Sequence, residues 1–231
     1  IVTINAEDYS NAKKMLCRKV FQLPGVGVDI ERMRLKKFDR DAYRESIGVH
    51  DGQIMVLSVG ELSARKNHEE IIKALALCQD KERFVYVICG RDVSGSGMHS
   101  KLQRLADELD VKIRLLGHRS DIPEINNCAD IAALPSLREG LGLAGIEALA
   151  AGIPLVGSDV QGIRDYVHSG VDGFLCNPHS EREWSDAIDK LVWLNAEQKE
   201  QMKKNCLKES EKYSIKKSLD TLKSIYEVVL P

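Results

Sequence analysis

The chain has 231 residues, a length that fits one large domain or one domain together with part of another. Its composition, 43% hydrophobic and 29% charged, is ordinary for a globular protein. The net charge of −2 gives no strong attraction to nucleic acid or to anionic membranes, so we expect no nucleic-acid partner. No apolar run approaches the ~18 residues of a membrane-spanning helix.

The six cysteines form no Cys-x-x-Cys pair, and most of them lie inside apolar segments. This pattern is typical of reduced, buried thiols in a cytoplasmic protein, and not of a disulfide framework or a zinc site. The first residue is Ile, not Met, and it opens directly into an apolar run. We therefore expect no signal peptide, and a start inside a longer protein.

Residues 1–29 predict a unit of their own. The apolar run "IVTIN", the helical pattern in "EDYSNAKKML" and the run "VFQLPG" read as a strand, a helix and a second strand. The turn "PGVGVD" follows, and its two glycines permit the positive φ angles of an interdomain hinge. We interpret this unit as the end of an N-terminal domain together with a hinge.

Strand-like and helical patterns then alternate. Strands are expected at 53–60, 83–90, 112–117, 131–136, 153–158 and 173–176. Helices are expected at 66–79, 98–110, 121–128, 143–151 and 162–168, and amphipathic helices close the chain. Short, continuously apolar strands between helices predict an α/β fold with a doubly wound, Rossmann-like parallel sheet over residues 30–205.

In such sheets, ligands bind where the strands end and the loops toward the helices begin. The loop "LREGLG" follows the fourth expected strand of the sheet. Gly140 and Gly142 let the backbone around Leu141 approach a ligand, and the helix that begins near Leu143 presents free N–H groups. This arrangement suits a phosphate or the hydroxyls of a sugar, and Glu139 would reach a different part of the same ligand.

Glu147 is the one carboxylate in the apolar helix "LAGIEALAA", which we expect to be largely buried. A buried carboxylate needs donors or a cation, because leaving it unpaired costs several kcal/mol. A ribose diol would offer two hydroxyl donors. Alternatively, Glu147 pairs with Arg138 or Arg164, and Glu139 is a solvated loop acid. The stretch alone leaves both interpretations open.

A second candidate loop lies in "VGELSARKNHEEII". The preceding strand ends at Gly60, and Lys66 lies near the start of the following helix. A lysine at that point, together with helix N–H groups, can neutralise a diphosphate. Alternatively, Arg65 and Lys66 are solvated and Asn67 caps the helix.

A third candidate loop lies in "LLGHRSDIPEI". It carries His118 and Arg119, and Asp121 is placed to cap a short helix. This loop could border a nucleobase, or it could be an ordinary capped loop.

Two further signals are discounted. Asp39 opens the sequence "DRD", which resembles a metal-binding Asp-x-Asp, but we interpret it as the cap of the helix "DAYRESIG". The stretch "GRDVSGSG" (90–97) is glycine-rich but lacks the Gly-x-Gly-x-x-Gly spacing of dinucleotide-binding folds. We expect neither a metal nor another cofactor.

With these loops identified, the chain resembles the C-terminal half of the family 4 glycosyltransferases, the retaining enzymes of the two-domain GT-B fold. The resemblance covers nearly the whole chain. It rests on "SLREGLGLAGIEALAAGIPLVGSDVQGIRDYV", with the family's two glutamates separated by seven residues. The segments "VGELSARKNHEEIIKAL", "LLGHRSDIPEINNCADI", "GVDGFLCNP" and "PGVGVD" also match.

The resemblance implies a role for each candidate residue. Lys66 and Glu139 would be the catalytic residues, with Lys66 stabilising the leaving diphosphate and Glu139 contacting hydroxyls of the donor sugar. Glu147 would bind the ribose, and His118 and Arg119 would flank the base. The remaining substrate-binding residues would be Gly60, Arg65, Gly140, Leu141, Gly142 and Leu143.

The sequence departs from the family pattern at one position. The family often has an arginine directly after the glycine that ends the first strand, and Glu61 stands there in this chain. Half of the usual cationic clamp is therefore missing, and Arg65 is the candidate to compensate.

The resemblance also implies an activity, the transfer of a sugar from a nucleotide sugar, most simply a UDP-sugar, to a saccharide or lipid-linked acceptor with retention. The expected context is surface polysaccharide synthesis, with peripheral membrane association of the full-length protein. Cationic side chains and helix N-termini would do the work of a metal. The alternatives are a sugar-nucleotide epimerase on the same fold, and a nucleotide-sugar-binding module without chemistry of its own.

The acceptor site of this family lies mainly in the N-terminal domain, so this chain alone would bind a donor without transferring its sugar. Residues 206–231 resemble the family's C-terminal segment, which crosses back toward that domain. We expect the apolar face formed by Leu219, Leu222 and Ile225 to be exposed for docking, or else to self-associate, fray or fold onto residues 1–22.

Overall fold

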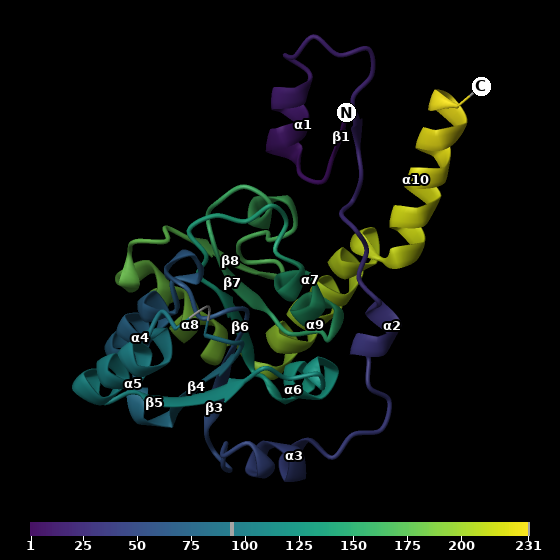
Figure 1. Cartoon of the computed structure of the whole chain (residues 1–231). Helices are drawn as coiled ribbons and strands as arrows, with labels where there is room; N and C mark the ends of the chain where they lie inside the picture. Colours follow the sequence, from purple (N-terminus) through teal and green to yellow (C-terminus); the bar gives the residue numbers. More distant parts are fainter. Residues whose placement is uncertain (93–94, 231) are drawn as a thin grey trace.

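The computed structural model describes residues 1–92 and 95–230, so Val93 and Ser94 of the glycine-rich stretch lie outside the described residues. A six-stranded parallel sheet forms its centre (Figure 1). All six strands expected for the sheet are confirmed, two of them with the expected bounds (112–117 and 173–176) and four of them shorter by one or two residues at an end. In chain order they are β3 (Ile54–Val59), β4 (Phe84–Cys89), β5 (Lys112–Gly117), β6 (Ile131–Leu134), β7 (Leu155–Ser158) and β8 (Gly173–Cys176).

The strands lie in the order β5-β4-β3-β6-β7-β8 across the sheet. Counted from the first strand of the sheet, this is the 3-2-1-4-5-6 order of doubly wound nucleotide-binding folds, so the expected fold class is confirmed. The chain builds outward from β3 in one direction and then returns to build outward from β6 in the other. β3 and β6 pair directly at this reversal, through Val56 and Leu57 of β3.

Helices cover both faces of the sheet, which explains why its strands are apolar along their whole length. Successive residues of β3 point into different cores, with Val56 on one side and Leu57 on the other. On one face α4 (His68–Leu77) packs between α5 (Met98–Leu109) and α8 (Glu181–Val192). On the other face lie α2 (Ile30–Met33), α3 (Arg40–Ser46), α6 (Ile122–Cys128), α7 (Leu143–Ala150) and α9 (Ala196–Ser210).

Two of the expected helices differ from the structure. Residues 64–66 form a turn of 3-10 helix and Asn67 has a left-handed backbone with φ of 53°, so α4 begins only at His68. The stretch 162–168 contains only a 3-10 turn, because Tyr166 leaves the helical path and is wholly buried in the core. Apolar spacing alone does not distinguish a short turn that fills a core from a full helix.

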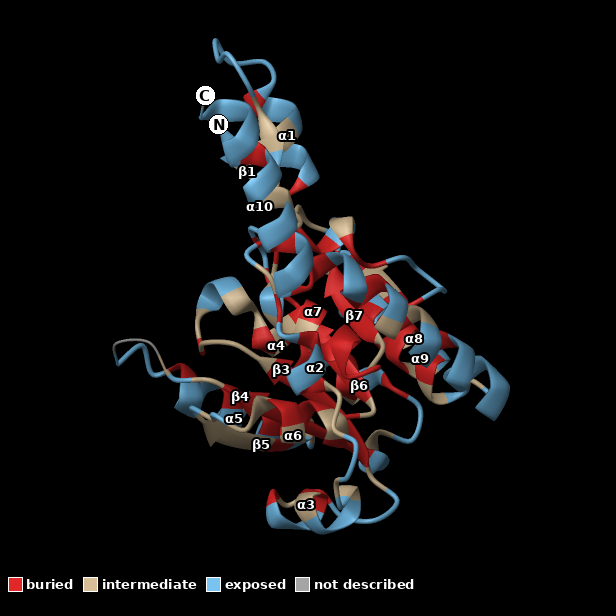
Figure 2. Cartoon of the chain, turned by 90° about the vertical axis from the view of Figure 1, so that its right-hand side faces the viewer, coloured by how far each residue is buried: buried red, intermediate tan, exposed pale blue. Residues whose placement is uncertain are grey.

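The N-terminal residues form the expected strand, helix and strand. β1 (Val2–Thr3) pairs in parallel with β2 (Phe21–Gln22), and α1 (Ala6–Ala12) connects them. Figure 2 shows this unit, together with α10 (Ile215–Val229), projecting from the sheet domain with mostly exposed residues. Gly25 and Gly27 both have positive φ, as the turn "PGVGVD" predicted, whereas the domain boundaries after residues 29 and 205 stay predictions.

The last helix, α10, lies beside residues 1–22. The Lys19 ammonium donates a hydrogen bond to the Val228 carbonyl at 2.9 Å, which ties the two segments together. Leu219 is exposed, as expected, but Leu222 is half-buried and Ile225 is buried. The prediction of a fully exposed apolar face was therefore wrong for Ile225, because the helix already packs at this end of the molecule.

All six cysteines are free thiols, as expected. Five of them are buried, and Cys17 in the N-terminal unit is exposed, so the expectation of burial fails at that position. Across the described residues, no helix combines the length and hydrophobicity needed to cross a bilayer.

Candidate functional site

The candidate site lies where the strand order reverses. Loops that leave β3 and β6 at their carboxyl ends turn to opposite faces of the sheet, and the crevice between them is where doubly wound sheets bind ligands. The loop after β3 carries Arg65 and Lys66, and the loop after β6 carries Glu139 and the glycines that follow it. The topology therefore brings together two of the three loops that the sequence indicated.

The loop after β6 is shaped by Gly142, which has a φ of 77° and immediately precedes α7. A Cβ at this position would lie 2.9 Å from Leu134 and 3.0 Å from the Tyr166 hydroxyl, so only glycine fits without a shift. The Tyr166 hydroxyl donates to the Gly142 carbonyl at 3.0 Å and fixes the turn. The free N–H groups of the first turn of α7, from Leu143, therefore border the crevice.

The loop after β3 brings Lys66 back over its own strand. A Cβ on Gly60 would lie 3.2 Å from the Lys66 side chain, so the absence of a side chain there makes room for the lysine. Asn67 precedes α4 but makes no side-chain cap, and its side-chain amide donates to the Pro178 carbonyl at 2.8 Å. The alternative of a solvated Arg65 and Lys66 beside a capping Asn67 is therefore wrong for the Asn67 side chain and for the half-buried Lys66, whereas Arg65 is exposed, as that alternative expected.

Lys66 and Glu139 form an ion pair across the crevice. The Lys66 Nζ lies 2.5 Å from Glu139 Oε1, and the side chains are only 13% and 9% exposed. Arg65 approaches the same oxygen at 3.5 Å, and its backbone carbonyl accepts a hydrogen bond from the Leu137 N–H at 2.8 Å. Glu139 is thus a buried, paired acid, and the alternative of a solvated loop acid is wrong.

A cavity of about 430 Å³ opens beside this pair. Five of the predicted site residues line it, and three residues that the sequence did not indicate complete its wall. The lining residues are Lys66, Glu139, Leu141, Gly142 and Leu143, joined by Ile4, Val26 and Ala144. A cavity of this volume suits a small-molecule ligand.

α7 is largely buried, as predicted, but Glu147 is only half-buried, whereas the sequence predicted a buried carboxylate. Together with Leu143 and Ala144 it forms the one face of α7 that is not fully buried, and those two residues line the cavity. No described residue forms an ion pair or a hydrogen bond with the Glu147 side chain, and Arg164 pairs with Asp159 instead. Burial raises the pKa of Glu147, and the positive charge of Arg32 opposes that shift.

The third predicted loop follows β5, which lies two strands from β3. His118 is exposed, and Arg119 binds both carboxylate oxygens of Asp121, at 2.9 and 2.6 Å. This pairing lowers the pKa of Asp121 to about 2. It also explains why Asp121 precedes α6 without capping it through its side chain, contrary to the prediction. The structure does not bring His118 and Arg119 into contact with the Lys66–Glu139 pair.

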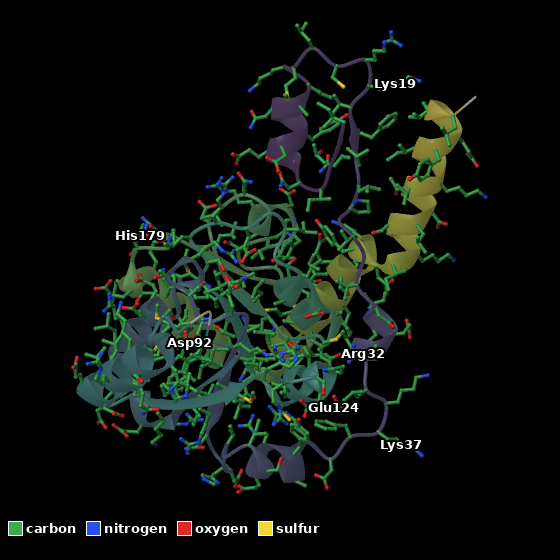
Figure 3. The ribbon with its side chains drawn as sticks, in the orientation of Figure 1. Lys19, Arg32, Lys37, Asp92, Glu124 and His179 are labelled. Carbon is green, nitrogen blue, oxygen red and sulfur yellow. The ribbon has the colours of Figure 1, made fainter. Side chains whose placement is uncertain are left out.

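Arg32 lies between that loop and Glu147, and no local pattern in the sequence indicated it. It belongs to α2, which packs on α6 and α7, and it is labelled in Figure 3. Its guanidinium donates to the Ser120 carbonyl in the third loop at 3.1 Å, and its charge acts on Glu147. Arg32 therefore lies between the predicted base loop and the predicted ribose-binding acid.

Asn5 is a second residue that sequence analysis missed. It is wholly buried, and its side-chain amide donates to the Gly140 carbonyl at 2.8 Å, in the centre of the loop after β6. Its side-chain oxygen accepts from the Asp8 N–H and caps α1. The helix cap was readable from the sequence, but the contact spans 135 residues and could not be read from local spacing.

A buried hydrogen-bonded chain supports the loop after β3. His68 lies within hydrogen-bond distance of the Glu61 carbonyl on one side (3.2 Å) and of the Tyr86 hydroxyl on the other (3.0 Å). Tyr86 donates to Ser58, and Ser58 donates to the Ala133 carbonyl of β6. Tyr86, Ser58 and the Ala133 carbonyl thus link three adjacent strands. A neutral His68 ring, which carries a single N–H, donates to only one of its two neighbours. Burial lowers the pKa of His68 to about 4, so the ring is neutral at neutral pH.

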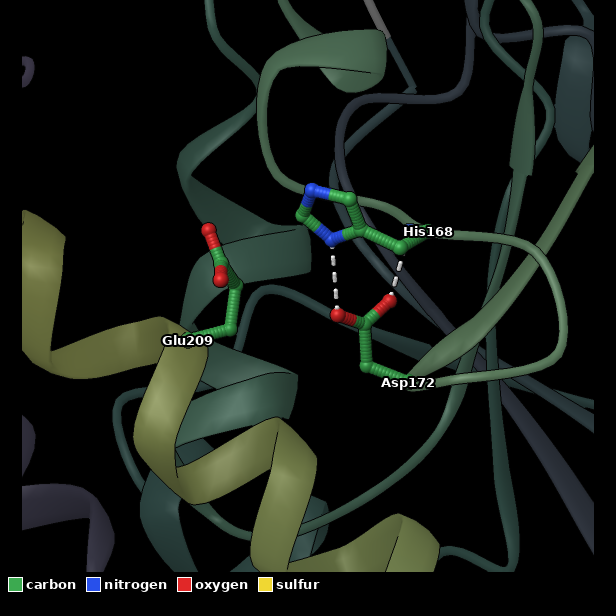
Figure 4. Close-up of side chains that lie close together, drawn as sticks. All are labelled: His168, Asp172 and Glu209. Atoms are coloured by element: carbon green, nitrogen blue, oxygen red, sulfur yellow. Dashed lines mark hydrogen bonds and ion pairs between the residues drawn. The ribbon is translucent and has the colours of Figure 1, made fainter.

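One cluster among the described residues has the composition of a metal site (Figure 4). It consists of His168, Asp172 and Glu209, with one ligand atom of each within 4.8 Å of the others. His168 Nδ1 lies 2.9 Å from Asp172, and Lys212 pairs with Glu209 at 2.6 Å, so ion pairs already account for the cluster. It lies at the amino end of β8, opposite the candidate site.

The Asp-x-Asp stretch that resembles a metal site is explained by a helix cap. Asp39 caps α3 by accepting from the Ala42 N–H, as expected.

Comparison with known proteins identifies the family. Residues 39–209 match the family model described as glycosyl transferases group 1. The chain belongs to this family. The fold is that of the C-terminal, Rossmann-like domain of GT-B glycosyltransferases, and the match covers the sheet, its helices and all three predicted loops.

Two curated relatives and one solved structure show how far the likeness extends. EpsD of Bacillus subtilis (strain 168), provisionally named a glycosyltransferase, is 30% identical over 197 residues, which are 83% of this chain and 51% of that protein. The D-inositol 3-phosphate glycosyltransferase of Mycobacterium tuberculosis (strain F11) is 35% identical over 179 residues, 75% of this chain and 36% of that protein. The chain therefore spans about half of the first relative and about a third of the second.

The solved structure is Anabaena HepE in complex with UDP and glucose. It superimposes with a TM-score of 0.87 at 21% identity, over 99% of this chain and 62% of that one. At this identity the likeness shows the fold alone. It nevertheless covers 99% of this chain, β1, α1, β2 and α10 included, so the arrangement of the N-terminal unit beside the last helix also occurs in HepE.

The buried His68 predicts a pH dependence of stability. Its pKa is about 4 in the folded chain and 6.5 when unperturbed, so the unfolded chain binds the additional proton between these values. The stabilisation is complete above pH 6.5 and is lost as the pH falls toward 4. The loss amounts to about 3 kcal/mol, at 1.36 kcal/mol for each unit of pKa.

Urea unfolding at pH 7 and pH 4.5 measures this effect. Between these values the free energy of unfolding of His68→Gln should fall less than that of the unaltered chain, because Gln does not titrate. His118→Gln, which removes an exposed histidine, should match the unaltered chain. Equal pH dependence in the His68 variant would contradict the prediction.

Proposed function

We propose that this chain is the donor-binding half of a retaining glycosyltransferase. It would take a sugar from a nucleotide sugar, most simply a UDP-sugar, and transfer it to a saccharide or lipid-linked acceptor. The observation that carries the proposal is the ion pair between Lys66 and Glu139 over the reversal point of the sheet, beside a cavity of about 430 Å³. Family membership and the UDP and glucose bound to HepE support it.

In this proposal the donor lies along the crevice. Lys66 meets the diphosphate, assisted by Arg65 and by the N–H groups at the start of α7, and it stabilises the negative charge that develops on the leaving group. Glu139 exchanges its lysine for hydroxyls of the donor sugar, while the backbone from Gly140 to Leu143 holds the sugar and the distal phosphate. These groups would stabilise the charge of the leaving diphosphate, which a metal ion stabilises in other enzymes, so we expect no cofactor.

Glu147 binds the ribose in this proposal, and His118 and Arg119 flank the base. The half-buried position of Glu147 without a described partner supports this role, because hydroxyl donors from a ligand would satisfy the carboxylate. Arg32 lies between the two groups and is a further candidate contact. The donor binds from the surface that faces the N-terminal unit, where Ile4 and Val26 line the cavity.

We further propose a cytoplasmic location and a role in surface polysaccharide synthesis, with the full-length protein associated with the inner face of the membrane. The acceptor would bind mainly in an N-terminal domain, of which β1, α1 and β2 form the end. The short parallel pair β1–β2 would then be an edge of that domain's sheet, because two strands of two residues cannot form a stable sheet alone.

Removal of the Glu147 charge should weaken UDP binding. We expect Glu147→Gln to lower the affinity about tenfold or more, because a hydrogen bond to a charged group contributes ~1.5–3 kcal/mol. Calorimetry with UDP and with its 2′-deoxy analogue makes the test specific, since the unaltered chain should prefer UDP and the variant should not. Glu200→Gln, on the exposed side of α9, is the control. A folded Glu147 variant with unchanged affinity would rule out the ribose assignment.

Loss of Lys66 should affect the diphosphate and not the nucleoside. Lys66→Ala is expected to weaken UDP binding by at least about tenfold, since a charge-assisted hydrogen bond is lost. Uridine, which lacks phosphate, should bind the variant and the unaltered chain alike, and Lys66→Arg should recover part of the UDP affinity. Equal losses for UDP and uridine would show that Lys66 acts elsewhere.

The chain alone should bind a nucleotide sugar without turning it over. Holding the acceptor hydroxyl within attack distance supplies ~7–11 kcal/mol of the barrier, and the surface that would hold it is not part of the described sheet domain. The test follows UDP release from UDP-sugars with candidate acceptors, before and after addition of an N-terminal domain. Robust release by the chain alone would refute the donor-half proposal, and product analysis would separate transfer from epimerisation.

A further inference from the structure

Glu61 places a negative charge at the carboxyl end of β3, beside the predicted diphosphate site. It is the first residue after Gly60, and its side chain is 40% exposed. Glu61 Oε1 accepts hydrogen bonds from the Arg65 guanidinium at 3.0 Å and from the Ser63 hydroxyl at 3.1 Å. The hydrogen bond from Arg65 lowers the pKa of Glu61, so this carboxylate is ionised at neutral pH.

The two candidate cations are both engaged by acids. Lys66 is held by Glu139 at 2.5 Å, and Arg65 is held by Glu61 at 3.0 Å and lies 3.5 Å from Glu139. The two cations and the two acids, Glu139 and Glu61, together carry no net charge. A diphosphate that enters the crevice must therefore compete for both cations, and it also meets the Coulomb repulsion of Glu61.

We propose that Glu61 limits the affinity of the site for diphosphates by withholding Arg65. The inference rests on the proposed function, because it takes the crevice to be the diphosphate site. We expect the diphosphate product to leave quickly as a consequence. The product is held by Lys66 and Arg65, and it has to compete with the Glu61 carboxylate for Arg65.

The opposite role is that Glu61 holds Arg65 in a productive position. The contacts of Arg65 argue against it. The Arg65 guanidinium also donates to the Arg138 carbonyl at 3.1 Å, and its backbone carbonyl is fixed by the Leu137 N–H. Arg65 therefore keeps its position at the crevice without Glu61, and removal of that carboxylate charge leaves a located cation with only Glu139, at 3.5 Å, as an acidic neighbour.

The two roles predict opposite effects of Glu61→Gln, which keeps the size of the side chain and removes its charge. We expect calorimetry to show UDP binding about three- to tenfold tighter in the variant, the range for one partly exposed charge acting on a multiply charged ligand. The gain should be smaller for UMP and absent for uridine. It should also shrink as salt is raised from about 0.05 to 0.5 M, because screening weakens exposed charges.

Two further variants make the test specific. Glu82→Gln removes one negative charge at the amino end of β4, far from the crevice, and should leave UDP affinity unchanged. In an Arg65→Met background, Glu61→Gln should tighten UDP binding much less, since only the direct repulsion by Glu61 is relieved and no cation is released. An undiminished gain in that background would overturn the role of Arg65.

The outcomes separate this inference from the proposed function. If the unaltered chain binds no UDP at all, the proposed function fails and this inference fails with it. If the chain binds UDP and Glu61→Gln leaves the affinity unchanged or lowers it, only this inference is overturned, and Glu61 is then a residue that positions Arg65.

Discussion

The ion pair between Lys66 and Glu139 joins the two loops that leave the sheet where its strand order reverses, and the shape of the candidate site depends on it. Both side chains are largely removed from water, and an unpaired charge in such a place is costly. Each residue therefore requires the other for as long as no ligand is present. The requirement can be met only because β3 and β6 are neighbours whose following loops turn to opposite faces.

This constraint makes ligand binding an exchange of partners. A diphosphate that takes Lys66 leaves Glu139 without its cation, unless the same ligand supplies hydroxyl donors to the carboxylate. A nucleotide sugar carries both groups on adjacent parts of one molecule, whereas free phosphate or free sugar carries only one. If the crevice binds its donor as proposed, the pair would favour the composite ligand over its fragments, because only the composite ligand would leave neither charge unpaired. Under the same proposal, the ribose hydroxyls would satisfy Glu147, which is half-buried and has no described protein partner.

The features that the sequence predicted correctly are those that depend on residues close together in the chain. Continuous apolar runs identified every strand of the sheet, and glycines identified the turn at Gly142, because both signals need only neighbouring residues. Lys66 and Glu139 could be proposed as site residues, but their mutual contact could not, since it depends on which strands lie side by side. The errors have the same origin. Asp121 was assigned a helix cap from its position, but Arg119, two residues away, binds its carboxylate more favourably than a backbone N–H would.

The contacts that could not be predicted from the sequence are those that the N-terminal β1–β2 unit makes with the loop after β6. Asn5 is fixed at both ends, by its own helix and by the Gly140 carbonyl, so it transmits the position of the β1–β2 unit directly to the loop that carries Glu139. A displacement of that unit must move the loop or break this bond, and a broken bond would leave one N–H of the wholly buried Asn5 amide without an acceptor, at a cost of ~1–3 kcal/mol, while the other still donates to Asp8. The orientation of the N-terminal unit and the geometry of the Lys66–Glu139 pair are therefore coupled. Any closure of a second domain over the crevice would be felt at the site through Asn5 and through Ile4 and Val26, which line the cavity.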